Sequence, residues 1–281
     1  MVLAKIRGFF NVYEKNRGAM VGLAVLSSCF AVALLAPFIS PYGPFEWAGG
    51  LFLPPSARYP FGTDNMGRDV LSGVIWGFRI SLLFGLGVAG ISLVIGVILG
   101  AIAGYFGGLV DDFLSRVFEI YMMIPAIFLI IMITAIFGAD IFRTMIVVGL
   151  TVWPSNAKIT RAQVLTLKSR AFVQASIGSG MSHLQIIYTH ILPNGIQPVI
   201  VNSTLQMASA IITEAGLSFL GLGDPNQRSW GQMLYYAQLS VKTAWWMAVF
   251  PGIAIVVLVV AFNLVGEGIS FAMNPKLQRR R

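Results

Sequence analysis

The chain has 281 residues, of which 57% are hydrophobic and only 11% are charged, and its formal net charge is +8. Soluble domains carry about a quarter charged residues, so this composition argues strongly against a water-soluble globule, and the apolar excess excludes disorder. The single cysteine, Cys29, excludes a disulfide framework and any cysteine-based zinc or iron–sulfur site.

Several stretches of the chain are long and apolar enough to cross a membrane, which takes about 20 residues in a helix. We predict six spans, over 20–39, 80–104, 119–138, 144–163, 196–217 and 246–266. The fourth has the shortest uncharged part, because Lys158 and Arg161 fall within it. Pro125, Pro154 and Pro251, in spans three, four and six, are expected to kink their helices.

Basic residues gather in alternate connections between these spans. Most of the lysines and arginines fall before span one, after spans two and four, and in the C-terminal tail. Because cytoplasmic loops of membrane proteins carry an excess of Lys and Arg, we expect both termini in the cytoplasm of a multi-pass protein of the cell (inner) membrane. The same rule accounts for much of the positive charge without invoking nucleic acid.

The spans divide the chain into regions. In order, these are a cytoplasmic N-terminus (1–19), a first transmembrane helix with an external segment (20–79), a transmembrane core (80–266) and a cytoplasmic basic tail (267–281). The core contains a cytoplasmic segment over 164–195 and an external segment over 218–245. Within the first external segment, five apolar residues from Val70 to Phe78 share one helix face. This pattern is typical of a helix that lies on the membrane surface ahead of span two.

Span two carries glycines four residues apart at Gly96, Gly100 and Gly104. Small residues at this spacing lie on one face of a helix and allow another helix to approach closely. The second helix belongs either to this chain or to a partner subunit, and the sequence does not distinguish the two.

The connection between spans four and five is longer than a passive link between helices, which takes about 2–8 residues. Its sequence predicts a short helix around 172–176, a break at Gly178 and Gly180, and a second helix around 183–191. An apolar helix pair outside the membrane needs to be covered, which indicates a partner protein.

Span five carries a polar stripe. Asn202, Gln206, Ser209 and Thr213 recur at helical spacing on one face, and Glu214 follows directly. Polar groups that face lipid are costly, so the stripe should face protein or water. It forms either the wall of a polar translocation path, which we favour, or hydrogen bonds between helices.

The connection after span four resembles a motif of ABC-importer permeases, E-A-A-x-x-x-G-x9-I-x-L-P. The chain reads Gln174-Ala175-Ser176, then Gly180, then His190-Ile191-Leu192-Pro193, and it departs from the motif at Gln174, Ser176 and His190. Stretches 61–82, 104–120, 161–176 and 214–234 are similar to corresponding segments of dipeptide/oligopeptide (peptide/nickel) permeases, in particular the second of the two paired permeases.

This resemblance implies an all-α membrane protein with six transmembrane helices and the architecture of a type I ABC-importer permease. It implies that the segment matching 172–193 contains a coupling helix, which sits in a cleft of a cytoplasmic ATPase and moves as the ATPase closes. The residues that the resemblance assigns to coupling are Phe172, Val173, Gln174, Ala175, Ser176, Gly178, Gly180, His183 and Pro193. Replacing the motif's first carboxylate by Gln174 puts one polar contact in doubt.

The resemblance also implies the partners: a homologous permease subunit, two ATPase subunits and an external solute-binding protein. The chain itself has no G-x-x-x-x-G-K-[ST] loop, no catalytic constellation and no metal-ligand cluster. We therefore expect a transport subunit without a cofactor of its own, with ATP and Mg held by the partner subunits. The implied cargo is a di- or oligopeptide, and the alternatives are nickel, oligosaccharides or, outside this class, a gradient-driven secondary transporter or a membrane enzyme.

Overall fold

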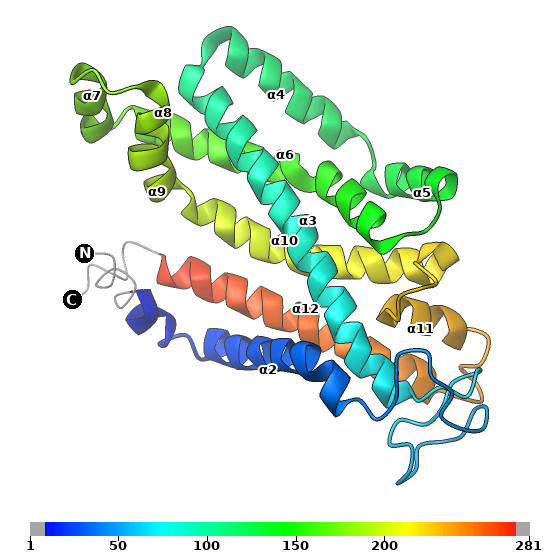
Figure 1. Cartoon of the computed structure of the whole chain (residues 1–281). Helices are drawn as coiled ribbons and strands as arrows, with labels where there is room; N and C mark the ends of the chain where they lie inside the picture. The colour runs from blue at the N-terminus through cyan, green and yellow to red at the C-terminus, as the bar shows by residue number, and fades with distance from the viewer. Residues whose placement is uncertain (1–8, 274–281) are drawn as a thin grey trace.

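The computed structural model describes residues 9–273, so the ends of the expected N-terminal region and basic tail lie outside the described residues. The described part is helical and contains no strand, only an isolated bridge between Thr63 and Asp69. Long helices lie side by side, and one of them, α3, crosses the others diagonally (Figure 1).

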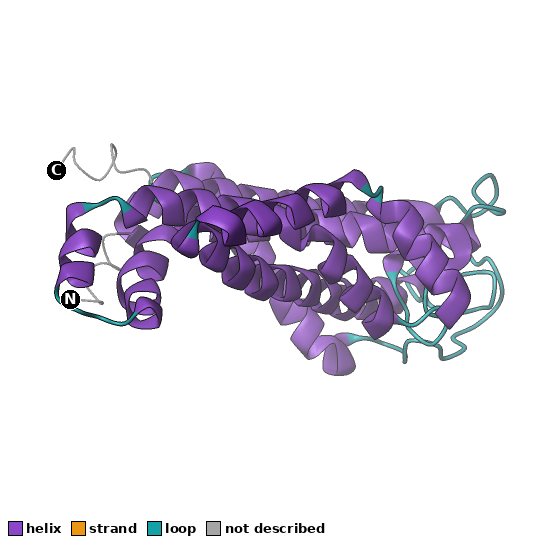
Figure 2. Cartoon of the chain, turned by 90° about the horizontal axis from the view of Figure 1, so that it is seen from above, coloured by secondary structure: helices purple, strands orange, loops and turns teal. Residues whose placement is uncertain are grey.

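The long helices are α2 (Arg17–Ile39), α3 (Val70–Phe106), α6 (Ile141–Lys168), α10 (Gln197–Leu217) and α12 (Trp246–Ala272). The shorter ones are α4 (Gly108–Met123), α5 (Ala126–Phe137), α7 (Ala171–Gly178), α8 (His183–Ile186), η1 (Ile187–Ile191), α9 (Leu192–Gly195), η2 (Ser218–Leu222) and α11 (Trp230–Ala237). The molecule is elongated, with α7 to α9 at one end, here the α7 end, and the loops beside α11 at the other, the α11 end (Figure 2).

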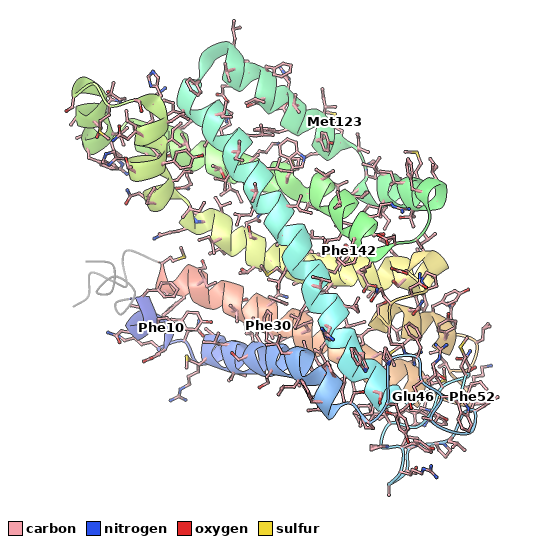
Figure 3. The ribbon with its side chains drawn as sticks, viewed as in Figure 1. Phe10, Phe30, Glu46, Phe52, Met123 and Phe142 are labelled. Carbon is pink, nitrogen blue, oxygen red and sulfur yellow. The ribbon has the colours of Figure 1, made fainter. Side chains whose placement is uncertain are left out.

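The helices confirm the all-α membrane fold but not six equivalent spans. Four are long and apolar enough to cross a membrane: α2, α3, α10 continued by η2, and α12. Helices α4 and α5 make a fifth candidate if the two, which are bent against each other, are counted as one span. Helix α6, where we predicted span four, is long enough but not apolar enough to be counted, because polar and charged residues occupy its second half. Large apolar side chains such as Met123 and Phe142 stand exposed on the outside of the helices (Figure 3).

The prediction of a surface helix over 70–78 that is separate from span two is wrong, because α3 runs without interruption from Val70 to Phe106. Asp69 starts the helix by accepting a hydrogen bond from the Ser72 backbone N–H at 2.7 Å. No proline follows to break it. At 1.5 Å per residue the helix is about 55 Å long, well beyond the ~30 Å of a bilayer's hydrocarbon core.

The three prolines expected to kink spans behave differently. Pro125 is the N-cap of α5, and α4 and α5 meet there at 75°. Pro154 and Pro251 instead lie inside the continuous helices α6 and α12. Pro125 therefore divides predicted span three into two helices.

The glycines of α3 pack against α6 within this chain. A Cβ atom added to Gly96 would lie 2.5 Å from the Asn156 Cβ, and one added to Gly100 would lie 2.4 Å from the Ala157 carbonyl oxygen. Both distances are too short for real atoms, so only glycine permits this approach. The sequence left open whether the facing helix belongs to this chain or to a partner subunit. The structure shows that it is α6 of this chain.

A buried ion pair ties the loops together at the α11 end. The Arg228 Nη2 donates to the Asp64 Oδ2 at 2.8 Å, and the two side chains are only 2% and 6% exposed. Close by, the Trp230 indole N–H donates to the Val74 carbonyl of α3. The segment before α3 and the segment after η2, far apart in sequence, are thus joined.

We expect Gly100→Ala to lower stability by about 1–3 kcal/mol, because the new methyl group meets backbone of α6 that has no room to move. Gly90→Ala, on the same helix with nothing within 4 Å of its Cβ position, is the matched control and should be neutral or slightly stabilising, because alanine favours a helix more than glycine does. Thermal unfolding of the purified protein measures both. Equal effects at the two positions would contradict the packing described.

We expect Arg228→Met to lower stability by about 3–5 kcal/mol, because it leaves the buried Asp64 carboxylate without its counter-charge. The control is Arg116→Met, which breaks the exposed pair of Arg116 with Glu119 and should be close to neutral. Denaturation midpoints of the two variants give the comparison. If Arg228→Met were as mild as the control, the pair would not hold the loops.

Candidate functional site

The α7 end of the molecule carries a small helical unit formed by α7, α8, η1 and α9, which extends beyond the long helices (Figures 1 and 2). An apolar cluster fixes it to the bundle. Val173 of α7 and Ile186 and Ile191 of the following helices are fully buried in one cluster with Tyr105 of α3 and Val164 of α6. The unit is therefore attached to the ends of both α3 and α6.

Glycine shapes the turn inside this unit. Gly180 has φ +77°, a left-handed conformation that other residues rarely adopt. Its N–H donates to the Ile177 carbonyl at 3.0 Å, and the Met181 N–H donates to the Ser176 carbonyl at 3.3 Å. These two bonds around a left-handed glycine make a Schellman motif, which ends α7 and turns the chain toward α8. Gly178 ends α7 without such a requirement.

The residues predicted for coupling divide into an inner and an outer set. Val173 and Ser176, three residues apart, are buried on the inner face of α7. His183 is exposed, but its ring contacts the bundle, because its Nδ1 lies 3.0 Å from the Tyr105 hydroxyl. The outer set is exposed and consists of Phe172, Gln174, Ala175, Gly178, Gly180 and Pro193.

Gln174, which departs from the resembled motif, has a contact inside the chain. Its side-chain amide donates to the Lys168 carbonyl oxygen at 2.8 Å. Lys168 is the last residue of α6, and carbonyls at a helix end lack intrahelical partners. Gln174 thus satisfies the end of α6 and fastens α7 to it.

Two exposed apolar side chains of this unit were missed by the sequence analysis. Leu184 and Tyr188 are each 65% exposed. They are four residues apart, so they project from the same face of the short helices α8 and η1. Their spacing was a signal that an outward apolar face exists, alongside the exposed Phe172 of α7.

The polar stripe of span five meets a buried asparagine of α6. The Asn156 Oδ1 accepts from the Asn202 Nδ2 at 2.8 Å, and the Asn156 Nδ2 lies 2.9 Å from the Gln206 Oε1. The same Nδ2 is 3.0 Å from the Ser92 hydroxyl of α3 and 3.2 Å from the Ser203 hydroxyl of α10. Asn156 is fully buried and joins three helices. No feature of its own stretch of sequence pointed to this role.

The other residues of the polar stripe do not contact Asn156. Ser209 is exposed, and the half-buried Thr213 donates its hydroxyl hydrogen to the Ser209 carbonyl at 2.9 Å. Glu214 is buried elsewhere, where its Oε1 accepts from the Ser218 hydroxyl at 2.7 Å. The structure therefore brings together Asn202 and Gln206 but separates Glu214 from them. Across the described residues, no group of three His, Cys, Asp or Glu side chains is placed to hold a metal ion.

Comparisons with known proteins show similarity to permeases of transport systems. Residues 96–279 match the family model "Binding-protein-dependent transport system inner membrane component", and residues 7–55 match "N-terminal TM domain of oligopeptide transport permease C". The chain is 38% identical to the "Di/tripeptide transport system permease protein DppC" of Pseudomonas aeruginosa, over 97% of this chain and 93% of that one. It is 38% identical to the "Dipeptide transport system permease protein DppC" of Bacillus subtilis, over 95% and 84%.

A solved structure shows the same fold. The MetNI methionine ABC transporter in inward-facing conformations contains a chain that superposes with a TM-score of 0.58 at 18% identity, covering 72% of this chain and 97% of that one. The family match covers most of the sequence, including the helical unit at the α7 end. The chain belongs to the family of binding-protein-dependent transport system inner membrane components, as a multi-pass permease subunit of the dipeptide/oligopeptide group that its sequence resembles.

Proposed function

We propose that this chain is one of the two permease subunits of an ATP-driven importer of di- or oligopeptides. The names of its relatives support the peptide cargo. The observation that carries the proposal is the helical unit at the α7 end, which combines a firmly attached inner face with exposed apolar side chains on its outer face. Exposed apolar side chains of this kind are more stable in contact with a partner protein than in water.

In this proposal the partner at the α7 end is a cytoplasmic ATPase subunit. Phe172, Leu184 and Tyr188 enter a cleft of the ATPase, while ATP and Mg are bound on the ATPase pair and this chain needs no cofactor. The basic residues Lys168 and Arg170 next to α7 support a cytoplasmic position for this end, and with it cytoplasmic termini. A homologous permease and an external solute-binding protein complete the importer.

Movement of the ATPase is passed on because the unit is attached to two helices that are themselves in close contact. Val173 packs beside Tyr105 of α3 and Val164 of α6, and Gln174 holds the end of α6. The glycines of α3 allow no gap between α3 and α6. A displacement of α7 therefore moves both helices as a rigid body, which is a common way to switch a membrane protein between inward-open and outward-open states.

The polar stripe of α10 has two parts with different proposed roles. Asn202 and Gln206 hold α10 to α6 through Asn156, with part of each amide still accessible. Ser209 and Thr213 continue the same face without a partner on another helix. We assign this face to the translocation path and Glu214, buried behind it, to supporting the external end of α10.

The proposal is tested by Leu184→Glu in the complete importer reconstituted in liposomes. Because a carboxylate would replace the exposed leucine on the docking face, we expect uptake of a labelled dipeptide and peptide-stimulated ATP hydrolysis to fall by roughly tenfold or more, the cost of one good contact. The control is Leu239→Glu at the α11 end, where Leu239 is 97% exposed. Normal stimulation in Leu184→Glu would reject the coupling role, and transport of nickel in place of dipeptide by the unmodified importer would reject the cargo.

A second prediction concerns the stripe. Ser209→Leu should slow dipeptide uptake per complex several-fold without lowering the amount of complex, because Ser209 is exposed and its side chain bonds to no other helix. Asn156→Leu should instead lower the amount of folded complex, since it removes the hydrogen bonds between three helices. Quantitative blotting beside initial uptake rates separates the two. Unchanged uptake per complex in Ser209→Leu would remove this face from the path.

A further inference from the structure

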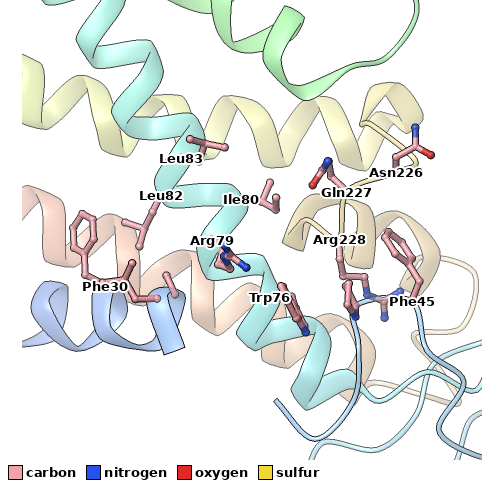
Figure 4. A pocket seen from close by; sticks show the side chains of 13 residues that line it. Phe30, Phe45, Trp76, Arg79, Ile80, Leu82, Leu83, Asn226, Gln227 and Arg228 are labelled. Carbon is pink, nitrogen blue, oxygen red and sulfur yellow. The ribbon is translucent and has the colours of Figure 1, made fainter. Parts of the chain in front are cut away.

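A cavity of about 480 Å³ opens at the α11 end between α2, α3 and the segment 226–228 (Figure 4). Its volume falls within the usual range of ligand pockets, about 300–1,000 Å³. None of the residues assigned above to coupling or to the translocation path lines it. The wall is mainly apolar and includes Phe30 and Leu34 of α2 and Ile80, Leu82 and Leu83 of α3.

The rim of the cavity is polar and positively charged. Arg79 lies with its guanidinium carbon 5.3 Å from the centre of the Trp76 ring, and Asn226 and Gln227 stand across from them (Figure 4). The residues lining the cavity include no carboxylate. Among the described residues Arg79 has no ion pair or hydrogen bond from its side chain, whereas Arg228, which also lines the cavity, is paired with Asp64. One exposed cation therefore remains without a protein counter-charge.

The position of the cavity along α3 relates it to the membrane. Arg79 is the last charged residue before a long uncharged stretch that begins at Ile80. Aromatic and basic side chains at such a point mark the boundary between headgroups and hydrocarbon. Leu34 and Leu83, which line the cavity, are also exposed, so its apolar wall is continuous with the exposed apolar surface of α2 and α3.

We propose that this cavity binds a phospholipid with an anionic headgroup. The phosphate is held by Arg79, whose planar guanidinium matches two phosphate oxygens, with the side-chain amides of Asn226 and Gln227 available to the rest of the headgroup. The start of an acyl chain lies against α2 and α3 and fills the space between them. The lipid thus adds a contact between α2 and α3 at the α11 end, beside the direct packing of α2 on α12. This inference depends on the membrane fold and not on the peptide cargo.

The test uses the complete importer, exchanged into detergent with added phosphatidylglycerol or phosphatidylcholine and then analysed by native mass spectrometry. We expect retention of phosphatidylglycerol over phosphatidylcholine, and a roughly tenfold loss of that retention in Arg79→Gln, as for a charge-assisted contact. Arg58→Gln is the matched control, because Arg58 is also exposed and lies 5.5 Å from the centre of an aromatic ring, that of Tyr59, but does not line the cavity.

Four outcomes would overturn the proposal. Equal losses in Arg79→Gln and Arg58→Gln would indicate general attraction of anionic lipid to positive charge. Equal retention of both lipids would show that the headgroup charge is not recognised. Leu83→Cys, cross-linked in the assembled importer, would attach to the other permease if that subunit, rather than a lipid, covers the cavity. A Leu83→Trp variant supports the proposal if it lowers phosphatidylglycerol retention while the importer still assembles, and contradicts it if retention is unchanged.

Discussion

The contact between α3 and α6 is the constraint on which the rest of the molecule depends. It requires hydrogen atoms in place of side chains at Gly96 and Gly100, where any Cβ would meet the facing helix. The same contact buries the part of α6 around Asn156, whose polar side chain would be costly in lipid. The hydrogen bonds of Asn156 to α3 and α10 then bring the third helix into a fixed position.

Both ends of the molecule are attached to this helix pair. At the α7 end, the helical unit packs on the last turns of α3 and α6, and the Tyr105–His183 contact adds a polar link. At the α11 end, Trp230 donates to the Val74 carbonyl near the start of α3, and the Arg228–Asp64 pair closes the loops over it. Both ends are therefore joined to the middle of the bundle through buried contacts of α3.

Much of this fold followed from local sequence, and the exceptions have physical reasons. The apolar stretches located α2 and α10 to within three residues and the start of α12 at Trp246, because length and hydrophobicity suffice for a span. The extent of α3 is not evident from the sequence, because its amphipathic start and its apolar continuation have the patterns of two separate helices. Gly180 was identified as a break, and its left-handed turn explains why. Asn156 was missed because its partners lie 46 to 64 residues away, a separation that no local pattern reports.

The uninterrupted course of α3 places a restriction on how this protein can vary. An α-helix turns by about 100° per residue, so a single insertion or deletion between Trp76 and Gly96 would rotate one half against the other. The glycine face would then miss α6, or the Trp76 side would leave the loops at the α11 end. A change of seven residues would restore the rotation but would shift one half by about 10 Å along the helix axis. The length of α3 between these two contacts is therefore fixed, whereas the loops outside it carry no such requirement.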